Sequence, residues 1–170
     1  MFDFFSARIN VLCLCFLSVG AMASTFDRTF TPQVMILKKS SHSLEIDMKP
    51  SFMAVYSSFL GSFLPVSVPI TVRSVDKSLM SYRIKLQTSQ HYCRDKGLEG
   101  VALPDLVTTK LDGNAFSSLD SGKEGHDGLL VIDSSESKHV MDVSFSTLPQ
   151  KEAVQECYGT FILIAEATAI

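Results

Sequence analysis

The sequence predicts an all-β sandwich of about seven strands, and three observations indicate this fold class. Apolar and polar residues alternate over several short segments, which is the period of a strand with one buried face. Glycine, proline, aspartate and serine separate these segments. Almost no stretch shows the helical spacing of apolar residues. Short alternating strands with turns between them are typical of two packed sheets.

Residues 1–23 are expected to be a secretory signal peptide. Arg8 precedes a short apolar run at 11–19, and the triplet Ala-Met-Ala at 21–23 is a small-residue cleavage site. The run is too short to span a bilayer, and a leucine precedes both of its cysteines, so we expect an exported chain without a lipid anchor. The remainder suffices for one domain. Its net charge is small and its basic residues are scattered along the sequence. The sequence therefore shows no basic patch of the kind that binds nucleic acid.

Residues 24–37 (STFDRTFTPQVMIL) form an alternating N-terminal extension. Arg28 and Pro32 interrupt its apolar face, and a proline cannot donate to a ladder of hydrogen bonds. We therefore expect a strand that lies at a sheet edge or against another chain, with an ordinary first strand of the domain as the alternative. The apolar face consists of Phe26, Phe30, Val34 and Ile36.

Further strands are expected at five places in the middle of the chain. Those at 66–73 and 80–93 are expected to be antiparallel neighbours, because only a short polar gap separates them. Pro69 indicates an edge or a bulge in the first of these two. The five segments are 44–48, 66–73, 80–93, 129–132 (expected to be buried) and 141–145.

Two segments carry no clear strand period. Residues 52–63 are apolar but irregular, and we interpret them as a kinked connection. Residues 94–128 are rich in glycine, aspartate, lysine and serine, and most of them are expected to be surface loop.

Two cysteines, Cys93 and Cys157, remain after the signal peptide. In an exported chain a single pair indicates a disulfide. A two-cysteine metal site or a thiol nucleophile is the alternative, although no CxxC motif is present. A disulfide would place the end of the strand at 80–93 beside the start of the last strand, as antiparallel neighbours.

The sequence contains no recognisable catalytic motif. No GxSxG, HExxH, glycine-rich phosphate loop or EF-hand pattern occurs, and no Ser, His and Asp arrangement can be named. We therefore expect no enzyme, no cofactor and no metal. The histidines are expected at the surface or at strand edges; they are His42, His91, His126 and His139.

Residues 157–170 (CYGTFILIAEATAI) are apolar on both faces. Such a strand must be central in its sheet, or another element must cover its outer face. A helix is the alternative, since the apolar residues also fall on one helical stripe. Gly159 and the surrounding aromatic and β-branched residues favour a strand. One face carries Phe161, Leu163, Ala165 and Ala167, and the other carries Tyr158, Ile162 and Ile164.

In this layout the chain resembles the pilin subunits of the chaperone/usher pathway. The resemblance consists of a cleavable signal, an alternating extension, a set of strands, and a last strand that opens with Tyr-Gly at 158–159 and continues apolar. Residues 66–88 are similar to the paired strands of the colonisation-factor (alpha) branch. The implied division is a signal at 1–23, a donor-strand extension at 24–37 and an immunoglobulin-like pilin domain at 38–170.

The resemblance implies donor-strand complementation, in which an incomplete sandwich is completed by another chain's strand. A periplasmic chaperone would fill the groove first, and the extension of the next subunit would replace it. The implied donor residues are Phe26, Phe30, Val34 and Ile36, and the implied groove and chaperone contacts are Tyr158, Phe161, Ile162, Leu163, Ile164 and Ala165.

The implied partners are neighbouring pilin subunits, a periplasmic chaperone, an outer-membrane usher and, through the fibre, a host receptor. The chain would be exported through the periplasm to a fimbrium on the cell surface, where it supports adhesion. The late cysteine pair and the penultimate Ala169 differ from the pattern of the type 1 branch, which has an early cysteine pair and a penultimate aromatic residue. A minor or tip-proximal subunit therefore agrees with the sequence as well as a major subunit does. The alternative is a freestanding secreted β-sandwich that binds through the loops between Arg94 and Gly128.

Overall fold

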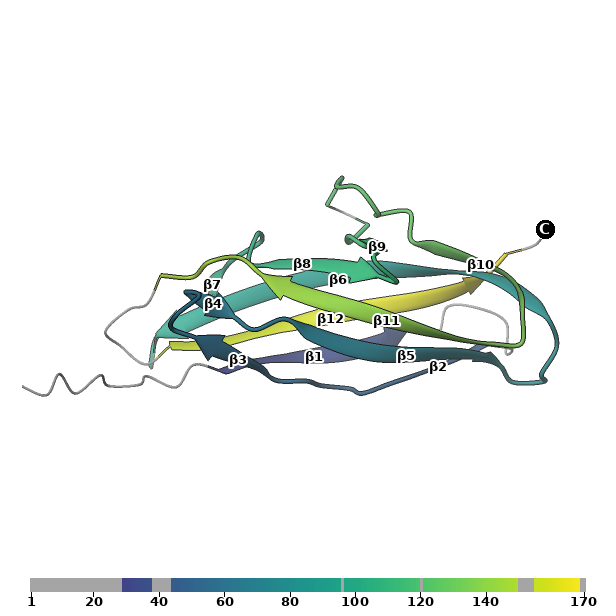
Figure 1. Ribbon diagram of the computed structural model, residues 1–170, viewed down its shortest axis with the longest axis horizontal. Coiled ribbons are helices and arrows are strands. Elements are labelled where there is room, and N and C mark those ends of the chain that lie inside the picture. The colour runs from purple at the N-terminus through teal and green to yellow at the C-terminus, as the bar shows by residue number, and fades with distance from the viewer. Residues whose placement is uncertain (1–28, 38–43, 96, 120, 150–154, 169–170) are drawn as a thin grey trace, which may run out of the picture.

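The computed structural model describes residues 29–37, 44–95, 97–119, 121–149 and 155–168, and it arranges them as two packed β-sheets (Figure 1). One sheet has the order β10-β6-β12-β1-β3-β4 with β7 paired to β6, and the other has the order β2-β5-β11-β8-β9. The predicted all-β sandwich is confirmed, and the arrangement is consistent with an immunoglobulin-like fold. The strands are β1 (Thr29–Leu37), β2 (Leu44–Met48), β3 (Ala54–Ser57), β4 (Ser62–Phe63), β5 (Val66–Ser74), β6 (Met80–Asp95), β7 (Val101–Ala102), β8 (Val107–Leu111), β9 (Asn114–Ala115), β10 (Leu129–Ser134), β11 (Glu136–Phe145) and β12 (Gln155–Ala167).

The alternation in the sequence decides which side chains enter the space between the sheets. In β5, Val68, Ile70 and Val72 are buried while the residues between them are more exposed. The facing sheet contributes the inward residues of β6 and β12 in the same way. The main core consists of Val34, Leu44, Ile46, Val68, Ile70, Val72, Tyr82, Ile84, Leu86, Leu111, Phe116, Met141, Val143, Phe161, Leu163 and Ala165.

The predicted pairing of β5 with β6 is wrong. β5 pairs with β2 and β11, whereas β6 pairs with β10 and β12 in the other sheet. Residues 75–79 therefore form an arch that crosses from one sheet to the other, and not a hairpin turn. Alternation defines the buried face of each strand, but a short polar gap fits both kinds of connection.

The last strand is confirmed as a central strand. β12 pairs antiparallel with β6 from Gln155 to Ala167 and parallel with β1 on its other side. Phe161, Leu163 and Ala165 are buried between the sheets, and Ile164 on the opposite face is buried as well.

The edge position predicted for β5 is wrong, because β5 lies between β2 and β11. Pro69 is tolerated there because β2 ends opposite Ile70, so Pro69 has a strand partner, Val140, on one side only.

Two further expectations change. Part of the segment 52–63 forms a hairpin of β3 and β4, which extends the sheet beyond β1. β10 was expected to be buried, but it is an edge strand with Leu130 and Ile132 exposed. No helix in the described part of the chain is long and apolar enough to cross a membrane.

Candidate assembly slot

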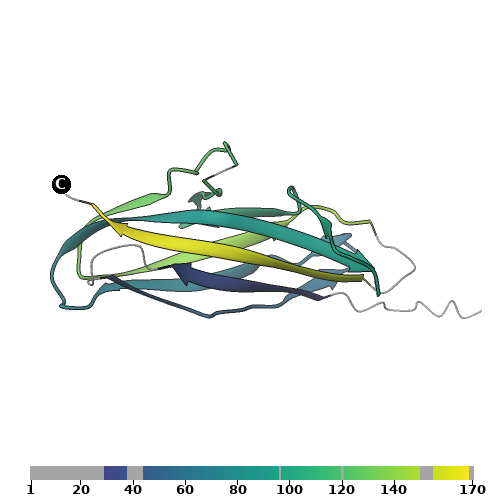
Figure 2. The same ribbon diagram turned by 180° about the vertical axis from the view of Figure 1, so that it is seen from behind.

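β1 fills a strip between β12 and β3, which we call the β1 slot. On one side it runs parallel to β12, with partners from Phe30 opposite Cys157 to Leu37 opposite Ile164. On the other side it pairs antiparallel with β3 through Thr29 and Phe30 only, supplemented by a bridge from Gln33 to Ser51. Figure 2 shows β1 lying along β12 from behind. The extension expected to insert into another chain thus occupies its own chain's sheet here, as in the alternative of an ordinary first strand.

Pro32 fits the slot because its missing N–H faces away from β12. The Val34 amide donates to the Pro50 carbonyl at 2.7 Å, on the side opposite β12. Residues two apart in a strand direct their N–H groups to the same side, so an N–H at Pro32 would also point there. The Pro32 side chain is buried with Phe30 and Val34. The expectation that Pro32 interrupts the apolar face is therefore wrong.

Phe30 is the largest side chain that β1 inserts, and it is fully buried. Its ring centroid lies 5.7 Å from that of Phe63, 5.0 Å from that of Phe145 and 5.8 Å from that of His91. Edge-to-face and tilted aromatic pairs at these distances are favourable beyond the burial of their area. Phe30 therefore joins β1 to side chains from β4, β6 and β11.

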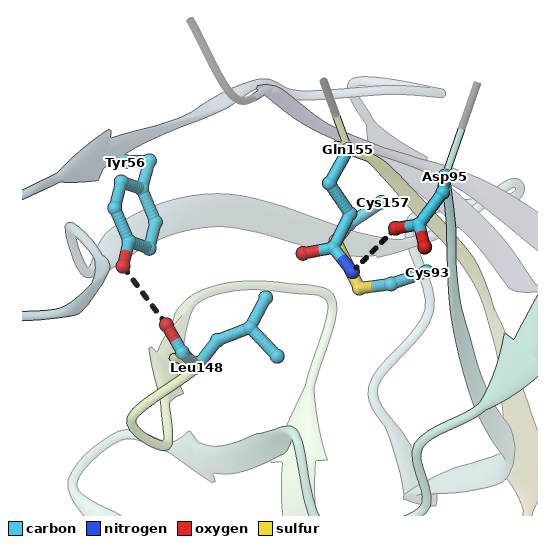
Figure 3. The surroundings of a disulfide bond; sticks show 6 residues. All are labelled: Tyr56, Cys93, Asp95, Leu148, Gln155 and Cys157. Atoms are coloured by element: carbon cyan, nitrogen blue, oxygen red, sulfur yellow. Dashed lines mark hydrogen bonds between the residues drawn. A yellow bond between two sulfur atoms is a disulfide. The ribbon is translucent and has the colours of Figure 1, made fainter. Parts of the chain in front are cut away.

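The Cys93–Cys157 disulfide lies at the same end of the slot (Figure 3). The two cysteines are directly opposite each other in the antiparallel pair of β6 and β12. Both the predicted disulfide and the predicted pairing of these strands are confirmed. Nearby, Gln155 donates to Asp95 and the Tyr56 hydroxyl donates to the Leu148 carbonyl at 2.8 Å.

His91 is buried beneath β1, with 2% of its surface exposed, so its predicted position at the surface or at a strand edge is wrong. Its Nε2 lies 2.7 Å from the Ser89 hydroxyl, and within the described residues its Nδ1 has no hydrogen-bond partner. A Cβ atom on Gly159 would lie 2.5 Å from this Nδ1, so β12 needs a glycine here. Burial lowers the pKa of His91 from 6.5 to about 4.

Acid should weaken the fold through His91. The unfolded chain takes up a proton near pH 6.5, whereas folded His91 resists protonation until about pH 4. The stability that neutral His91 contributes is thus complete above pH 6.5 and is lost as the pH falls towards 4. At about 1.4 kcal/mol per pKa unit, the loss is roughly 2–4 kcal/mol.

The measurement is urea unfolding of wild type and His91→Leu between pH 7.5 and 4. The leucine variant should lose less stability over this window, because the protonation of His91 no longer contributes to the loss. Parallel curves for the two proteins would contradict the prediction.

The structure brings together many of the predicted assembly residues. Phe30 and Val34 face inward from β1, and Ile36 lies opposite Leu163 in the ladder; Phe26 lies outside the described residues. Among the predicted groove residues, Phe161, Leu163, Ile164 and Ala165 are buried, Ile162 is half-buried and Tyr158 is exposed on the outer face.

A serine, a histidine and an aspartate do meet where β11 packs beside the β8–β9 turn. His139 lies with Nδ1 2.7 Å from Asp112 and Nε2 2.8 Å from the Ser137 hydroxyl. Ser137 also contacts the hydroxyl of buried Tyr82, and Asp112 accepts the amide of Val140 at 2.8 Å. These groups satisfy one another and fix the β8–β9 turn against β11, so we interpret them as a structural network.

The network shows what the sequence reasoning missed. His139 is buried in a central strand, and not at the surface or at a strand edge as predicted. His139 lies two and four residues before the buried Met141 and Val143, so the alternation along the strand places it on the same inward face. Within the described residues, no group of three or more His, Cys, Asp or Glu side chains is placed to hold a metal ion.

Part of the predicted loop region lines a shallow hollow on the outer face of the β12 sheet. Tyr92 and Tyr158 stack there with centroids 5.6 Å apart, and the Arg94 guanidinium lies 5.7 Å from the centre of the Tyr158 ring. Arg94 also pairs with Glu156 at 2.8 Å. The hollow is lined by Tyr92, Arg94, Gly97, Leu98, Glu99, Gly100 and Tyr158.

Two fimbrial proteins are among the solved structures that resemble this chain, both at low similarity. No protein-family model and no curated protein sequence matches the chain. Among solved structures, the CooA pilin subunit from enterotoxigenic Escherichia coli has a TM-score of 0.29 and 12% identity to this chain. The match covers 80% of this chain and 97% of the CooA chain. A mutant of the CFA/I adhesin CfaE from enterotoxigenic E. coli has a TM-score of 0.24 and 8% identity to this chain. The match covers 85% of this chain and 49% of the CfaE chain. Overlaps this low carry no argument about the role of the chain.

Proposed function

We propose that this chain is a structural subunit of a bacterial surface fimbria. It polymerises when its N-terminal strand, residues 24–37, enters the β1 slot of a neighbouring subunit. Before assembly a periplasmic chaperone covers the slot, and an outer-membrane usher exports the growing fibre. The subunit supports adhesion through the fibre and catalyses no reaction.

One observation carries the proposal: the segment predicted from the sequence to be a donor strand is the segment that fills the slot. Its main-chain ladder to β12 spans eight residue pairs, and Phe30, Pro32 and Val34 fill the space beneath. A slot that accepts this strand from its own chain presents its main-chain groups and apolar surface to the same strand from a second copy. Exchange of an identical element between copies is a known route to assembly.

The local connections of β1 favour such an exchange. β3 pairs with β1 through two residues only, so few main-chain bonds besides those to β12 must break. Residues 38–43 (KKSSHS) separate β1 from β2 and carry no apolar residue. They supply a polar link that can connect the strand to a body lying outside the slot.

The test is a chain that begins at residue 38. Without β1, the slot exposes the surfaces that Phe30 and Val34 cover, so this protein should aggregate or remain unfolded. Addition of a peptide of residues 24–37 should restore a soluble, folded complex, measured by size exclusion and circular dichroism.

The matched control is the same peptide with Phe30→Asp and Val34→Asp, which should not rescue folding because it would bury two unpaired charges. A truncated chain that folds alone as a stable monomer would contradict the proposal. That result would favour the secreted binding protein that uses the loops between Arg94 and Gly128.

A further inference from the structure

Exposed apolar side chains gather at both ends of the long axis of the sandwich. The hairpin pole is the end with the β3–β4 turn, where Phe59 is 95% exposed and Leu60 is 52% exposed. The arch pole is the end where residues 75–79 join β5 to β6, with Val75 59% and Leu79 70% exposed. Figures 1 and 2 both show β3 and β4 at one end and the arch at the opposite end.

Hydrogen bonds hold the hairpin pole in shape. The Gly61 amide donates to the Ser57 carbonyl at 2.9 Å, and the Leu148 amide donates to the Gly61 carbonyl at 2.7 Å. The backbone of Gly61 has a φ of +63°, which a glycine adopts without strain. Phe59 is therefore presented at the tip of a fixed turn.

The arch pole is fixed by the Asp76 carboxylate. It accepts the Ser74 hydroxyl at 2.5 Å, the Ser78 hydroxyl at 2.7 Å and the Ser78 amide at 3.1 Å. Side chains presented on a fixed backbone lose less conformational entropy when they bind. Exposed apolar side chains that lie next to one another are typical of interaction surfaces.

The connection of β1 to the body limits where a donating copy can lie. β1 ends opposite Ile164 and β2 begins opposite Ser74, so both flanks of the link at 38–43 lie towards the arch pole. A link of this length spans at most about 25 Å. When β1 is donated, the arch pole of the donor must therefore lie near the point where β1 leaves the acceptor.

The direction of the donated strand then decides the symmetry. A strand inserted parallel to β12, as within the single chain, leaves the acceptor at its arch pole. Two arch poles then face each other, and a reciprocal exchange closes as a dimer. An antiparallel strand leaves at the hairpin pole, so each arch pole meets the hairpin pole of the next copy. This head-to-tail contact does not close and extends into a fibre.

We propose that in the assembled fibre Phe59 and Leu60 of one copy pack against Val75 and Leu79 of the next copy. The inference rests on the proposed function, because it requires β1 to be donated between copies. The contact joins two exposed apolar turns at opposite poles.

The test is cross-linking of the full mature chain, residues 24–170, carrying Phe59→Cys and Leu79→Cys. The native cysteines are joined to each other, so the introduced thiols are available to a short bismaleimide. Concentrated protein is held just below its unfolding midpoint, where β1 can leave its own slot, and is then cross-linked and analysed on a denaturing gel. A ladder of covalent multimers is expected from the double variant.

Two controls define the contact. Phe59→Cys with Val140→Cys should give no ladder, because Val140 is exposed in the middle of β11 and away from both poles. Phe59→Ser alone should slow polymer formation several-fold without changing the melting midpoint of the monomer, since the side chain makes little contact within its own chain.

Three results would contradict the inference in distinguishable ways. Polymers without a covalent ladder would overturn the pole contact and leave the proposed function standing. Covalent dimers from Leu79→Cys alone would indicate two facing arch poles and a closed assembly. The absence of multimers by size exclusion would count against the proposed function itself.

Discussion

Replacement of Phe30 by alanine should lower the free energy of unfolding by about 3–5 kcal/mol, the range for a fully buried phenylalanine. Phe30 has no exposed surface and contacts the rings of Phe63, His91 and Phe145. Truncation would leave a cavity bounded by side chains from three other strands, which relax only partly. The measurement is urea unfolding followed by circular dichroism, with the midpoint and slope compared between the two proteins.

Phe59→Ala is the matched control, because it removes the same side chain from a position that is 95% exposed. Its effect should stay within about 0.5 kcal/mol. A loss below about 1 kcal/mol for Phe30→Ala would mean that β1 does not occupy the slot of the free chain in solution. The pair of variants thus tests the placement of β1 separately from any assembly.

Removal of the disulfide by Cys93→Ala with Cys157→Ala should cost about 4 kcal/mol. The bond closes a loop of 64 residues, and in the chain-entropy model the cost of losing such a constraint depends on loop length. Both cysteines are buried next to Phe30, Ala54, Phe63 and Leu106 in a second core cluster, so the alanines would also leave small gaps. The expected result is a lower urea midpoint with a comparable or steeper slope.

Wild-type protein treated with a thiol reductant provides the control for this prediction. Reduction leaves both sulfur atoms in the core, so it isolates the loss of the cross-link from the loss of packing. Reduced wild type should be somewhat more stable than the double variant and clearly less stable than the oxidised protein. Equal stability of the oxidised and reduced forms would show that the cross-link contributes nothing measurable.

The sequence predicted the strands better than their neighbours. The alternation of Val68, Ile70 and Val72 identified the buried face of β5. The pairing of β6 with β12 followed from the expected disulfide, because Cys93 ends one strand and Cys157 begins the other. No such tie joins β5 to β6, and the gap at 75–79 suits a hairpin or an arch equally. Strand partners depend on contacts between distant segments, which local patterns do not encode.

The candidate slot was predicted in part. Phe30 and Val34 lie on the inward face of β1, and Phe161, Leu163 and Ala165 lie on that of β12, as the parity of these residues indicates. His91 was misplaced at the surface although it shares the parity of Cys93 two residues later. Histidine occurs both in protein interiors and at surfaces. The prediction relied on the residue type, although the alternation pattern gave the correct face.

By itself the sequence determined the fold class, the inward faces of the main strands, the cross-linked pair Cys93 and Cys157, and the strand character of the N-terminal segment that forms β1. The tertiary structure alone decided that β1 lies parallel to β12 in its own chain, that the network of His139 and Asp112 forms, and that apolar turns stand at opposite poles. The physical reason is the range of the interactions. Side-chain parity is set by the backbone of a few residues, whereas strand order, strand direction and the position of a pole are set by contacts across the whole chain.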